Sequence, residues 1–410
     1  MIKMLKLDKS KKYLLACSFG PDSMALLSML QTEGFDFDVA HVNYNLREES
    51  LIEKESLIKY CGENSINLFI EEIEKDSITG NLENKCRKIR YSFFRDLFKS
   101  GNYESLLVAH HEDDHIETYL LQKDRKNIVS YYGLSPKRNL FGMSVERPLL
   151  SVSKSDILEY CKNNNVSYSI DKTNLENTYK RNKIRHNIVE KFNKQERETI
   201  LLEIAKNNKK IQELKENLKK INLNYVKNIV NLDDFSFAIA LHLELEKISN
   251  GDVEKTSISR KFANEIKKAL LSDIPNISFS INKDISFVKN YDECGFKRTE
   301  ENKPYSYTLS GPGKLETEYF TLDFTGDTKN RNVSLKDYPL TIRNAKLNDR
   351  FDVKDYKTSI RRAFIDWKMP KEIRAYWPVI ENKDGKIIYV PRYRKNFVPK
   401  PNDNFFVKIK

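Results

Sequence analysis

The sequence predicts an α/β protein whose N-terminal domain is a doubly wound parallel sheet, followed by a helical middle region and a small α+β C-terminal domain. From residue 12 to about residue 110, short apolar strand candidates alternate with segments of helical periodicity. Such alternation is typical of βαβ units and a parallel sheet. Charge divides the chain further, because nearly all its excess positive charge lies in the last 80 residues. We expect domains at 1–190, 191–335 and 336–410.

The predicted strands are 13–17, 37–43, 67–73 and 105–109, and the predicted helices are 23–33, 47–63 and 82–100. In a parallel sheet, ligands bind outside the carboxyl ends of the strands. Three polar clusters follow strands in this way, at 18–23, 43–47 and 110–117. Beyond them we expect a long charged helix over 192–225, more helices over 238–271, a hairpin around Asn282-Lys283 and a strand-like stretch over 296–335.

The first polar cluster is Ser18-Phe19-Gly20-Pro21-Asp22-Ser23. It lies between a predicted strand and a predicted helix, and Asp22 or Ser23 suits the N-cap of that helix. Such a turn directs backbone N–H groups and a helix N-terminus at one point, which suits a phosphate. It is not a Walker A loop, because no Lys precedes the Ser. An ordinary strand-to-helix turn fits these six residues equally well.

Composition favours a globular protein of the cytoplasm. The 410 residues are 39% hydrophobic and 32% charged, and no run of about 18 apolar residues suggests a membrane span. Residues 1–12 are charged throughout and lack the apolar core of a signal peptide. The five cysteines are dispersed without a Cys-x-x-Cys pair. That spacing argues against a disulfide framework, a structural zinc site and an iron–sulfur cluster.

The C-terminal charge suggests a surface for nucleic acid. From Arg331 onwards there are 20 Lys and Arg against 9 Asp and Glu, a net charge of +11 out of +12 for the whole chain. Aromatic residues are interleaved with these charges, and that mixture suits phosphate attraction and base stacking. The alternative is a solvated basic face over a small core that contains most of these aromatic side chains.

The third polar cluster, His110 to Thr118, combines histidines with acids. We expect a helix to begin near Asp113, so that Asp114 and Glu117, three residues apart, point the same way. A transition-metal site is the alternative, but the adjacent His110 and His111 should diverge on an extended segment. On the predicted helix 82–100, Arg87 and Arg90 share a face that suits a phosphate or a carboxylate, or is merely solvated.

The first cluster resembles the Ser-Gly-Gly-x-Asp-Ser pyrophosphate loop of ATP pyrophosphatases, although Phe19 replaces the usual first Gly. Further motifs make the set similar to the tRNA(Ile)-lysidine synthetase family over residues 12 to about 190. They are Asn81-Leu82-Glu83 with Arg87 to Tyr91, Ala109 to Asp114 with Glu117-Thr118, Arg147 to Leu150, and Asp171 to Asn174 with Tyr179, Arg181-Asn182 and Ile184-Arg185. From Leu340 onwards the chain also resembles the C-terminal domain of that family. Residues 123–132 and Asn348 depart from its pattern.

The resemblance implies an enzyme that uses ATP and Mg²⁺ to adenylate the wobble cytidine of tRNA(Ile) and then joins free L-lysine to it. Asp22, Asp114 and Glu117 would be catalytic, Ser18 to Ser23 would hold ATP, and Asp22 would also bind the metal. Lysine or tRNA would contact Arg87, Arg90, His110, His111, Asp113, Arg181 and Arg185. A homodimer is possible. The alternatives are another tRNA-modifying enzyme with this loop, or a non-catalytic RNA-binding protein, which would leave the first and third clusters unexplained.

Overall fold

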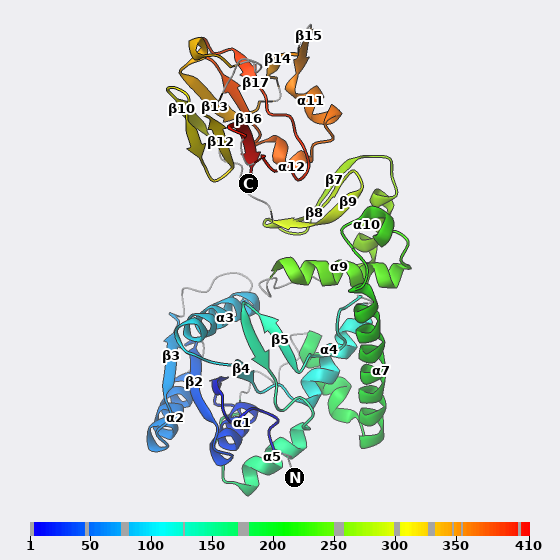
Figure 1. The fold of residues 1–410 in the computed structure, drawn as a ribbon. Coiled ribbons are helices and arrows are strands. Elements are labelled where there is room, and N and C mark those ends of the chain that lie inside the picture. The colour runs from blue at the N-terminus through cyan, green and yellow to red at the C-terminus, as the bar shows by residue number, and fades with distance from the viewer. Residues whose placement is uncertain are drawn as a thin grey trace. The chain divides into compact units, whose positions relative to one another are not determined.

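The computed structural model describes residues 4–45, 49–74, 82–125, 128–170, 180–249, 258–298, 304–326, 333–346, 348–353, 356–400 and 403–410. The side chains of 82–84 and 180–182 are not among the described parts. The chain forms two compact units (Figure 1), one of residues 1–223 and 228–268, the other of 224–227 and 269–410. The predicted boundaries near residues 190 and 335 both fall inside these units.

The first unit contains the predicted parallel sheet. Its strands lie in the order β3-β2-β1-β4-β6-β5, and all neighbours run parallel except β5 and β6. The strands are β1 (Lys12–Ala16), β2 (Asp36–Asn43), β3 (Leu68–Glu72), β4 (Ser105–Val108), β5 (Lys137–Leu140) and β6 (Met143–Glu146). The β5–β6 hairpin was not predicted, because both strands are only four residues long and three of the four residues of β5 are polar and exposed.

Helices cover both faces of this sheet, which confirms the doubly wound prediction. Buried side chains of α1 (Pro21–Thr32), α2 (Glu49–Glu63) and α5 (Lys154–Asn163) share one core with the sheet. Helix α3 (Leu82–Ser100) packs with Leu14, Leu106 and Val145 in a second core on the other face. In the strand order β3-β2-β1-β4-β6-β5, successive strands are added on one side up to β3 and on the other side from β4 onwards. The strand order thus reverses between β1 and β4, and ligands of such sheets bind at that point.

The helical middle region is also confirmed. After α4 (Glu112–Asp124) and α5 come α6 (Lys180–Asn187), a 3₁₀ turn (Val189–Lys191), α7 (Lys194–Leu218), α8 (Val226–Ile229), α9 (Asp234–Ser249) and α10 (Arg260–Leu270). Helix α7 is the long charged helix predicted over 192–225. Its N-terminus is fixed by a capping box, in which Asn193 and Glu196 exchange side-chain and backbone hydrogen bonds.

The second unit consists of antiparallel sheets with two short helices. The predicted hairpin is formed by β7 (Asn276–Ser280) and β8 (Ile285–Asn290), which continue to β9 (Glu293–Arg298). Two further sheets have the orders β10-β13-β16-β17 and β11-β12-β18, and β14 pairs with β15. Their bounds are β10 (Ser306–Leu309), β11 (Lys314–Glu316), β12 (Phe320–Phe324), β13 (Leu340–Asn344), β14 (Arg350–Val353), β15 (Tyr356–Ser359), β16 (Pro378–Glu381), β17 (Ile387–Tyr389) and β18 (Phe405–Ile409), with a 3₁₀ turn at Leu335–Asp337 and helices α11 (Ile360–Asp366) and α12 (Lys371–Arg374).

Strands from both sides of residue 335 share one core in this unit. Strand β10 pairs with β13, and β12 pairs with β18. Phe320 and Phe324 pack with Ile342 and Phe405. Removing the chain beyond residue 335 would therefore take away strands on which the preceding segment depends.

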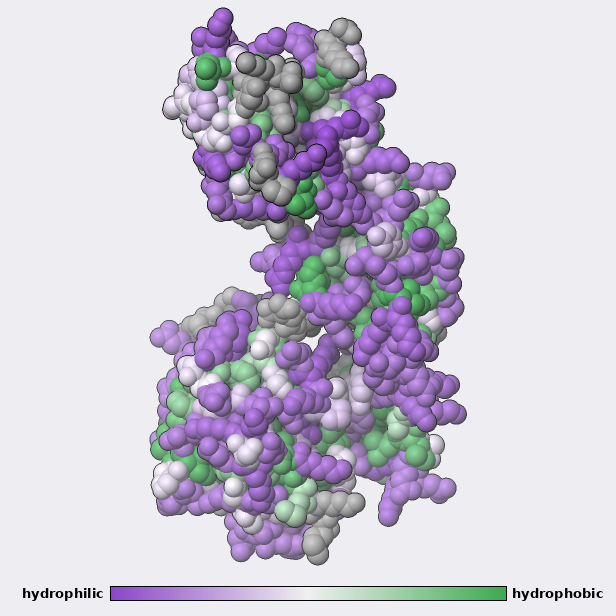
Figure 2. Space-filling view, viewed as in Figure 1, coloured by the Kyte–Doolittle hydropathy of each residue, from purple (hydrophilic) through white to green (hydrophobic). Residues whose placement is uncertain are grey.

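Most aromatic side chains of the basic C-terminal segment are structural. Phe364 and Trp377 are buried, and the Trp377 indole donates a hydrogen bond to the Pro391 carbonyl oxygen at 2.8 Å. Tyr356 is the exception, at 64% exposure. Basic residues such as Arg361 and Arg362 lie on the surface, and hydrophilic side chains cover much of the face shown in Figure 2. No helix in the described ranges is long and apolar enough to cross a membrane.

Candidate functional site

The loop after β1 is held in a tight turn by Ser23. The Ser23 hydroxyl accepts a hydrogen bond from the Ser18 N–H at 3.2 Å and donates one to the Gly20 carbonyl oxygen at 3.0 Å. Helix α1 begins at Pro21 with Gly20 as its N-cap, so the predicted cap at Asp22 or Ser23 was wrong. Pro favours the first helical position, because the N–H that it lacks has no partner there.

Phe19 occupies the one left-handed position of this loop. Its φ is 61°, a conformation that costs a residue other than glycine about 1–2 kcal/mol. The ring is buried in the core beneath the loop, at 6% exposure, which contributes about 1.5–3 kcal/mol. The Phe19 carbonyl also accepts a hydrogen bond from the Ser169 N–H at 3.0 Å. Burial therefore offsets the backbone strain.

Asp22 lies in the first turn of α1 and faces two cationic or polar groups. The Lys154 ammonium is 2.5 Å from Oδ1, and His111 Nε2 is 3.8 Å from Oδ2. The Asp22 side chain is 28% exposed, so a ligand can reach it. Within the described residues, no group of three or more His, Cys, Asp or Glu side chains is placed to hold a metal. One carboxylate together with substrate phosphates is nevertheless a usual Mg²⁺ site, and Asp22 fits that arrangement.

Lys154 is a site residue that the sequence analysis missed. It is the first residue of α5, directly after the Ser153 N-cap. A cation is unfavourable at a helix N-terminus, where the helix dipole is positive. The sequence analysis predicted no helix here, so this unfavourable position could not serve as a signal, and the partner Asp22 is 132 residues away in the sequence.

His111 connects this loop to the acidic cluster. It is the N-cap residue of α4. Its ring Nδ1 accepts a hydrogen bond from the Asp113 backbone N–H at 3.3 Å, and its backbone N–H donates one to the Asp114 carboxylate at 3.0 Å. The other ring nitrogen, Nε2, is 3.6 Å from Asp114 and 3.8 Å from Asp22. Helix α4 begins one residue earlier than predicted, at Glu112.

Asp114 and Glu117 point the same way, as predicted, and both bind Arg185 of α6. The Arg185 guanidinium donates from Nε and Nη2 to the Glu117 carboxylate, and Nη2 also donates to Asp114 at 3.1 Å. Burial opposes the charge of Arg185, but the two carboxylates outweigh it and raise the pKa of Arg185. The Glu117 side chain is fully enclosed, whereas that of Asp114 is 11% exposed.

Asp113 pairs with a residue that sequence reasoning missed. Arg197 of α7 contacts Asp113 at 2.6 Å and Glu112 at 3.2 Å, and Nη2 also donates to the Val189 carbonyl oxygen at 3.0 Å. Burial raises the pKa of Glu112, although Arg197 opposes the shift. No local pattern marks Arg197, because its partners lie 84 and 85 residues earlier.

The adjacent histidines diverge, as predicted. His110 leaves β4 toward β6, where the Arg147 Nε donates to its Nδ1 at 3.2 Å. On α3, the guanidinium groups of Arg87 and Arg90 lie 4.6 and 5.8 Å from the Tyr91 ring centroid. The structure thus brings together Asp22, His111, Asp114, Glu117 and Arg185. The Arg181 side chain and the predicted motifs at Asn81 and 171–179 lie outside what the structure describes.

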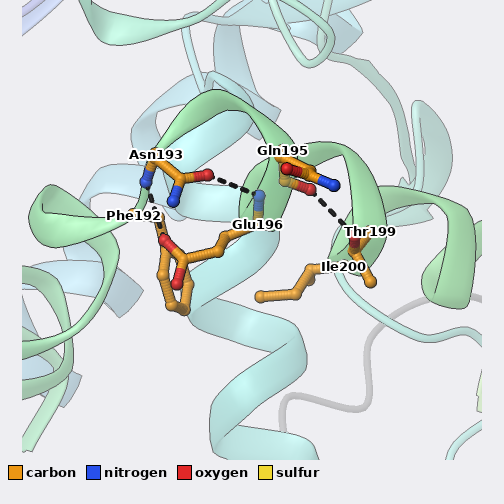
Figure 3. Close-up of a pocket in the computed structure, with 6 residues that line it drawn as sticks. All are labelled: Phe192, Asn193, Gln195, Glu196, Thr199 and Ile200. Carbon is orange, nitrogen blue, oxygen red and sulfur yellow. Dashed lines mark hydrogen bonds between the residues drawn. The ribbon is translucent and has the colours of Figure 1, made fainter.

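A surface depression of about 360 Å³ lies elsewhere, at the N-terminus of α7 (Figure 3). It is lined by Phe192, Asn193, Gln195, Glu196, Thr199 and Ile200. None of the predicted site residues lines it. Asn193 and Glu196 are already engaged in the capping box of α7, so the depression gives no reason to move the site from the carboxyl edge of the sheet.

Comparison with known proteins decides the family. Residues 1–192 match the model of the PP-loop domain. The chain is 33% identical to the tRNA(Ile)-lysidine synthase of Mycoplasma mycoides subsp. mycoides SC over 408 residues, which cover 94% of this chain and 98% of that one. The chain belongs to the tRNA(Ile)-lysidine synthase family. It is also 30% identical to the tRNA(Ile)-lysidine synthase of Mesoplasma florum, over 94% of this chain and 99% of that one.

Among solved structures, the U34-tRNA thiolase NcsA from Methanococcus maripaludis with its [4Fe-4S] cluster is similar to half of this chain. The match covers 50% of this chain and 74% of that one, with 14% identity and a TM-score of 0.40.

Two of the three departures from the tRNA(Ile)-lysidine synthase pattern, Phe19 and the stretch of residues 123–132, can be described from their local structure. Phe19 stands at the left-handed position for which the usual Gly is suited. The stretch that includes 128–132 ends at Gly133, where φ is 70° and a Cβ would lie 2.6 Å from the His115 ring. Tyr132 exchanges backbone hydrogen bonds with the Asn208 side chain, at 2.8 and 2.9 Å. This stretch is therefore anchored on α4 and α7.

We predict that Phe19→Gly destabilises the protein. Losing a buried aromatic ring costs about 3–5 kcal/mol, whereas relief of the left-handed strain returns about 1–2 kcal/mol, so the net loss should be about 1–4 kcal/mol. Urea unfolding followed by circular dichroism measures it. Phe19→Ala, which loses the ring but keeps the strain, should be less stable than Phe19→Gly by about 1 kcal/mol. A Phe19→Gly variant more stable than the wild type would contradict this account.

Proposed function

We propose that this protein ligates free L-lysine to carbon 2 of the wobble cytidine in the CAU anticodon of tRNA(Ile), converting ATP to AMP and pyrophosphate. The observation that carries the proposal is that one histidine lies between the predicted nucleotide loop and the acidic cluster. His111 Nε2 is within 4 Å of both Asp22, on the predicted nucleotide loop, and Asp114, in the acidic cluster. Membership of the tRNA(Ile)-lysidine synthase family supports it. A cytoplasmic location belongs to the same proposal.

In the first step, the oxygen on carbon 2 of the cytidine bonds to the α-phosphorus of ATP, and the bond to pyrophosphate breaks. The loop from Ser18 to Ser23 and the N-terminus of α1 supply N–H groups and positive potential for the phosphates. Lys154 adds a positive charge beside Asp22. Mg²⁺ bound by Asp22 and the phosphates would neutralise negative charge on the departing pyrophosphate.

In the second step, the lysine side-chain amine bonds to carbon 2, AMP leaves with the oxygen, and the amine loses a proton. Asp114 and Glu117 place two carboxylates side by side, and Arg185 contacts both of them. A carboxylate is the group that forms the strongest hydrogen bonds with an ammonium. Asp114 is the more accessible of the two carboxylates, so we assign it the contact with lysine and give Glu117 the role of holding Arg185. A carboxylate beside the attacking amine can also accept its proton.

We further propose that the basic surface of the second unit binds tRNA phosphates. Arg361 and Arg362 lie exposed on α11, and Arg392 and Arg394 lie exposed after β17. Such contacts position the RNA without specifying a base. The base must then be recognised in the first unit, beside the chemistry.

We predict that Asp22→Asn abolishes AMP formation and leaves tRNA affinity nearly intact, because Asp22 serves the nucleotide. Release of AMP from labelled ATP, dependent on lysine and tRNA, measures activity, and filter binding measures tRNA affinity. Asp36→Asn is the matched control, since Asp36 is exposed at the start of β2, on the opposite edge of the sheet. Equal losses of activity and tRNA binding in a folded Asp22→Asn protein would refute this division of roles.

We predict that Asp114→Asn impairs use of lysine more than adenylation. A hydrogen bond to a charged group contributes about 1.5–3 kcal/mol, so the lysine KM should rise roughly 10- to 150-fold. The KM for lysine is measured in the ligation assay, and adenylation is measured as pyrophosphate release without lysine. An unchanged lysine KM and turnover number would remove Asp114 from the lysine site.

We predict that Arg361→Gln combined with Arg362→Gln weakens tRNA binding and flattens its dependence on salt. The log of affinity falls with log salt in proportion to the phosphates neutralised, so two lost contacts should reduce the slope by about 2. The matched control is Lys59→Gln with Lys99→Gln, which removes two charges near the C-terminal ends of α2 and α3. Identical slopes for the double variant and the wild type would mean that this surface is only solvated.

A further inference from the structure

Two amide oxygens in the second unit are buried without a hydrogen-bond partner. They are Oδ1 of Asn276 on β7 and Oδ1 of Asn290 on β8, and neither has a partner among the described residues. Asn290 as a whole is only 8% exposed. A buried polar atom without a partner is destabilising, and folded proteins contain few such atoms. A ligand that contacts both oxygens would remove this penalty.

The strand register places these two amides and one carboxylate on the same face of the sheet. Asn290 is the register partner of Asn276 on one side and of Glu293 on the other. Side chains of such opposed residues point to one face, with their Cβ atoms about 4.5–5.5 Å apart. The neighbouring Lys289 points to the opposite face, where its ammonium donates to two backbone carbonyl oxygens at 3.0 and 2.6 Å. Asn276, Asn290 and Glu293 therefore form a row across β7, β8 and β9.

Helix α12 brings a second carboxylate to this row. The Asn290 Nδ2 donates a hydrogen bond to Glu372 Oε2 at 2.9 Å. A carboxylate can only accept hydrogen bonds, so the amide nitrogen must face Glu372, and the direction of the Asn290 oxygen is thereby fixed. Glu293 forms an ion pair with Lys395, which is more than half exposed. Two carboxylates and two amide oxygens thus gather where α12 meets the three-stranded sheet.

We propose that Asn276, Asn290, Glu293 and Glu372 bind a divalent cation, Mg²⁺ or Ca²⁺, which joins the β7–β9 sheet to α12. Carboxylate and amide oxygens are the ligands that these ions prefer, and water molecules complete their coordination. Only two of the four side chains are acidic, which agrees with the absence of a cluster of three or more His, Cys, Asp or Glu in the described residues. A buried water molecule is the other partner with suitable chemistry, and the experiment distinguishes the two.

The test titrates Mg²⁺, and separately Ca²⁺, into full-length protein that has been treated with a chelator. This parent protein carries Asp22→Asn and is kept free of nucleotide, so that the metal site proposed at the nucleotide loop does not contribute. Calorimetry measures the affinity and the number of ions bound, and thermal unfolding measures stability. We expect one ion per chain and a Tm that rises with the ion concentration, because the ion binds the folded state.

Asn276→Leu separates ion binding from structure. It should weaken ion binding roughly 10- to 150-fold, the range for one interaction with a charged group. In chelator, the same variant should be at least as stable as its parent, because it removes an unpartnered buried oxygen. Glu372→Gln should also weaken binding, whereas Lys395→Met, which removes an ammonium that competes for Glu293, should strengthen it. Asp284→Asn is the matched control and should keep the parental affinity, since Asp284 is exposed in the turn at the other end of the β7–β8 pair.

Three outcomes would overturn the inference. A parent protein that takes up neither ion and keeps its Tm would leave water as the partner of the two amide oxygens. Parental affinity in both Asn276→Leu and Glu372→Gln would place the ion elsewhere. An equal loss of affinity in Asp284→Asn would mean that the ions only screen surface charge. If Asn276→Leu does not fold, the titration of Glu372→Gln decides, and its affinity must fall. The lysine ligation assay tests the proposed function separately, so either proposal can fail alone.

Discussion

The parallel pairing of β1 with β4 is the constraint on which the site depends. Leu14 and Leu106 are register partners in the middle of this pair, and both are fully buried. Because the strand order reverses here, the loop after β1 and the start of α4 leave the sheet side by side. Only that adjacency brings His111 to within 4 Å of Asp22, 89 positions earlier in the chain. A sheet with β4 at any other place would hold the same motifs but separate them.

Acidic side chains near the start of α4 also hold α6 and α7, which follow it in the chain. Arg185 of α6 pairs with Asp114 and Glu117, and Arg197 of α7 pairs with Glu112 and Asp113. Removing one partner of a buried ion pair is strongly destabilising, at about 3–5 kcal/mol. The same helix therefore holds α6 and α7 against the sheet and leaves the Asp114 side chain 11% exposed. In the proposed function, the same carboxylates would serve both stability and ligand binding.

Residues that break local rules gather at this edge of the sheet. Phe19 adopts a left-handed conformation, Lys154 places a cation at a helix N-terminus, and Arg147 is a buried cation that donates hydrogen bonds to neutral groups. Each choice is unfavourable for the local structure alone. Such conflicts are expected where a chain must satisfy a ligand as well as its own fold. Their concentration around Asp22 and His110 is consistent with a site at the carboxyl ends of β1, β4 and β6.

The sequence by itself determined the α/β class, four strands of the sheet, the long helix α7, the hairpin at Asn282 and the loops that carry Asp22 and Asp114. These features follow from side-chain periodicity and turn chemistry, which depend on neighbours along the chain. The tertiary structure alone decided that β5 and β6 extend the sheet, that Gly20 caps α1, that Lys154 pairs with Asp22, that Arg147 contacts His110 and that Arg197 pairs with Asp113. Each of those three side chains contacts a partner tens of residues away, at 132, 37 and 84 positions. The free energy of the whole fold decides which distant groups come into contact. The local periodicity of the sequence does not contain that information.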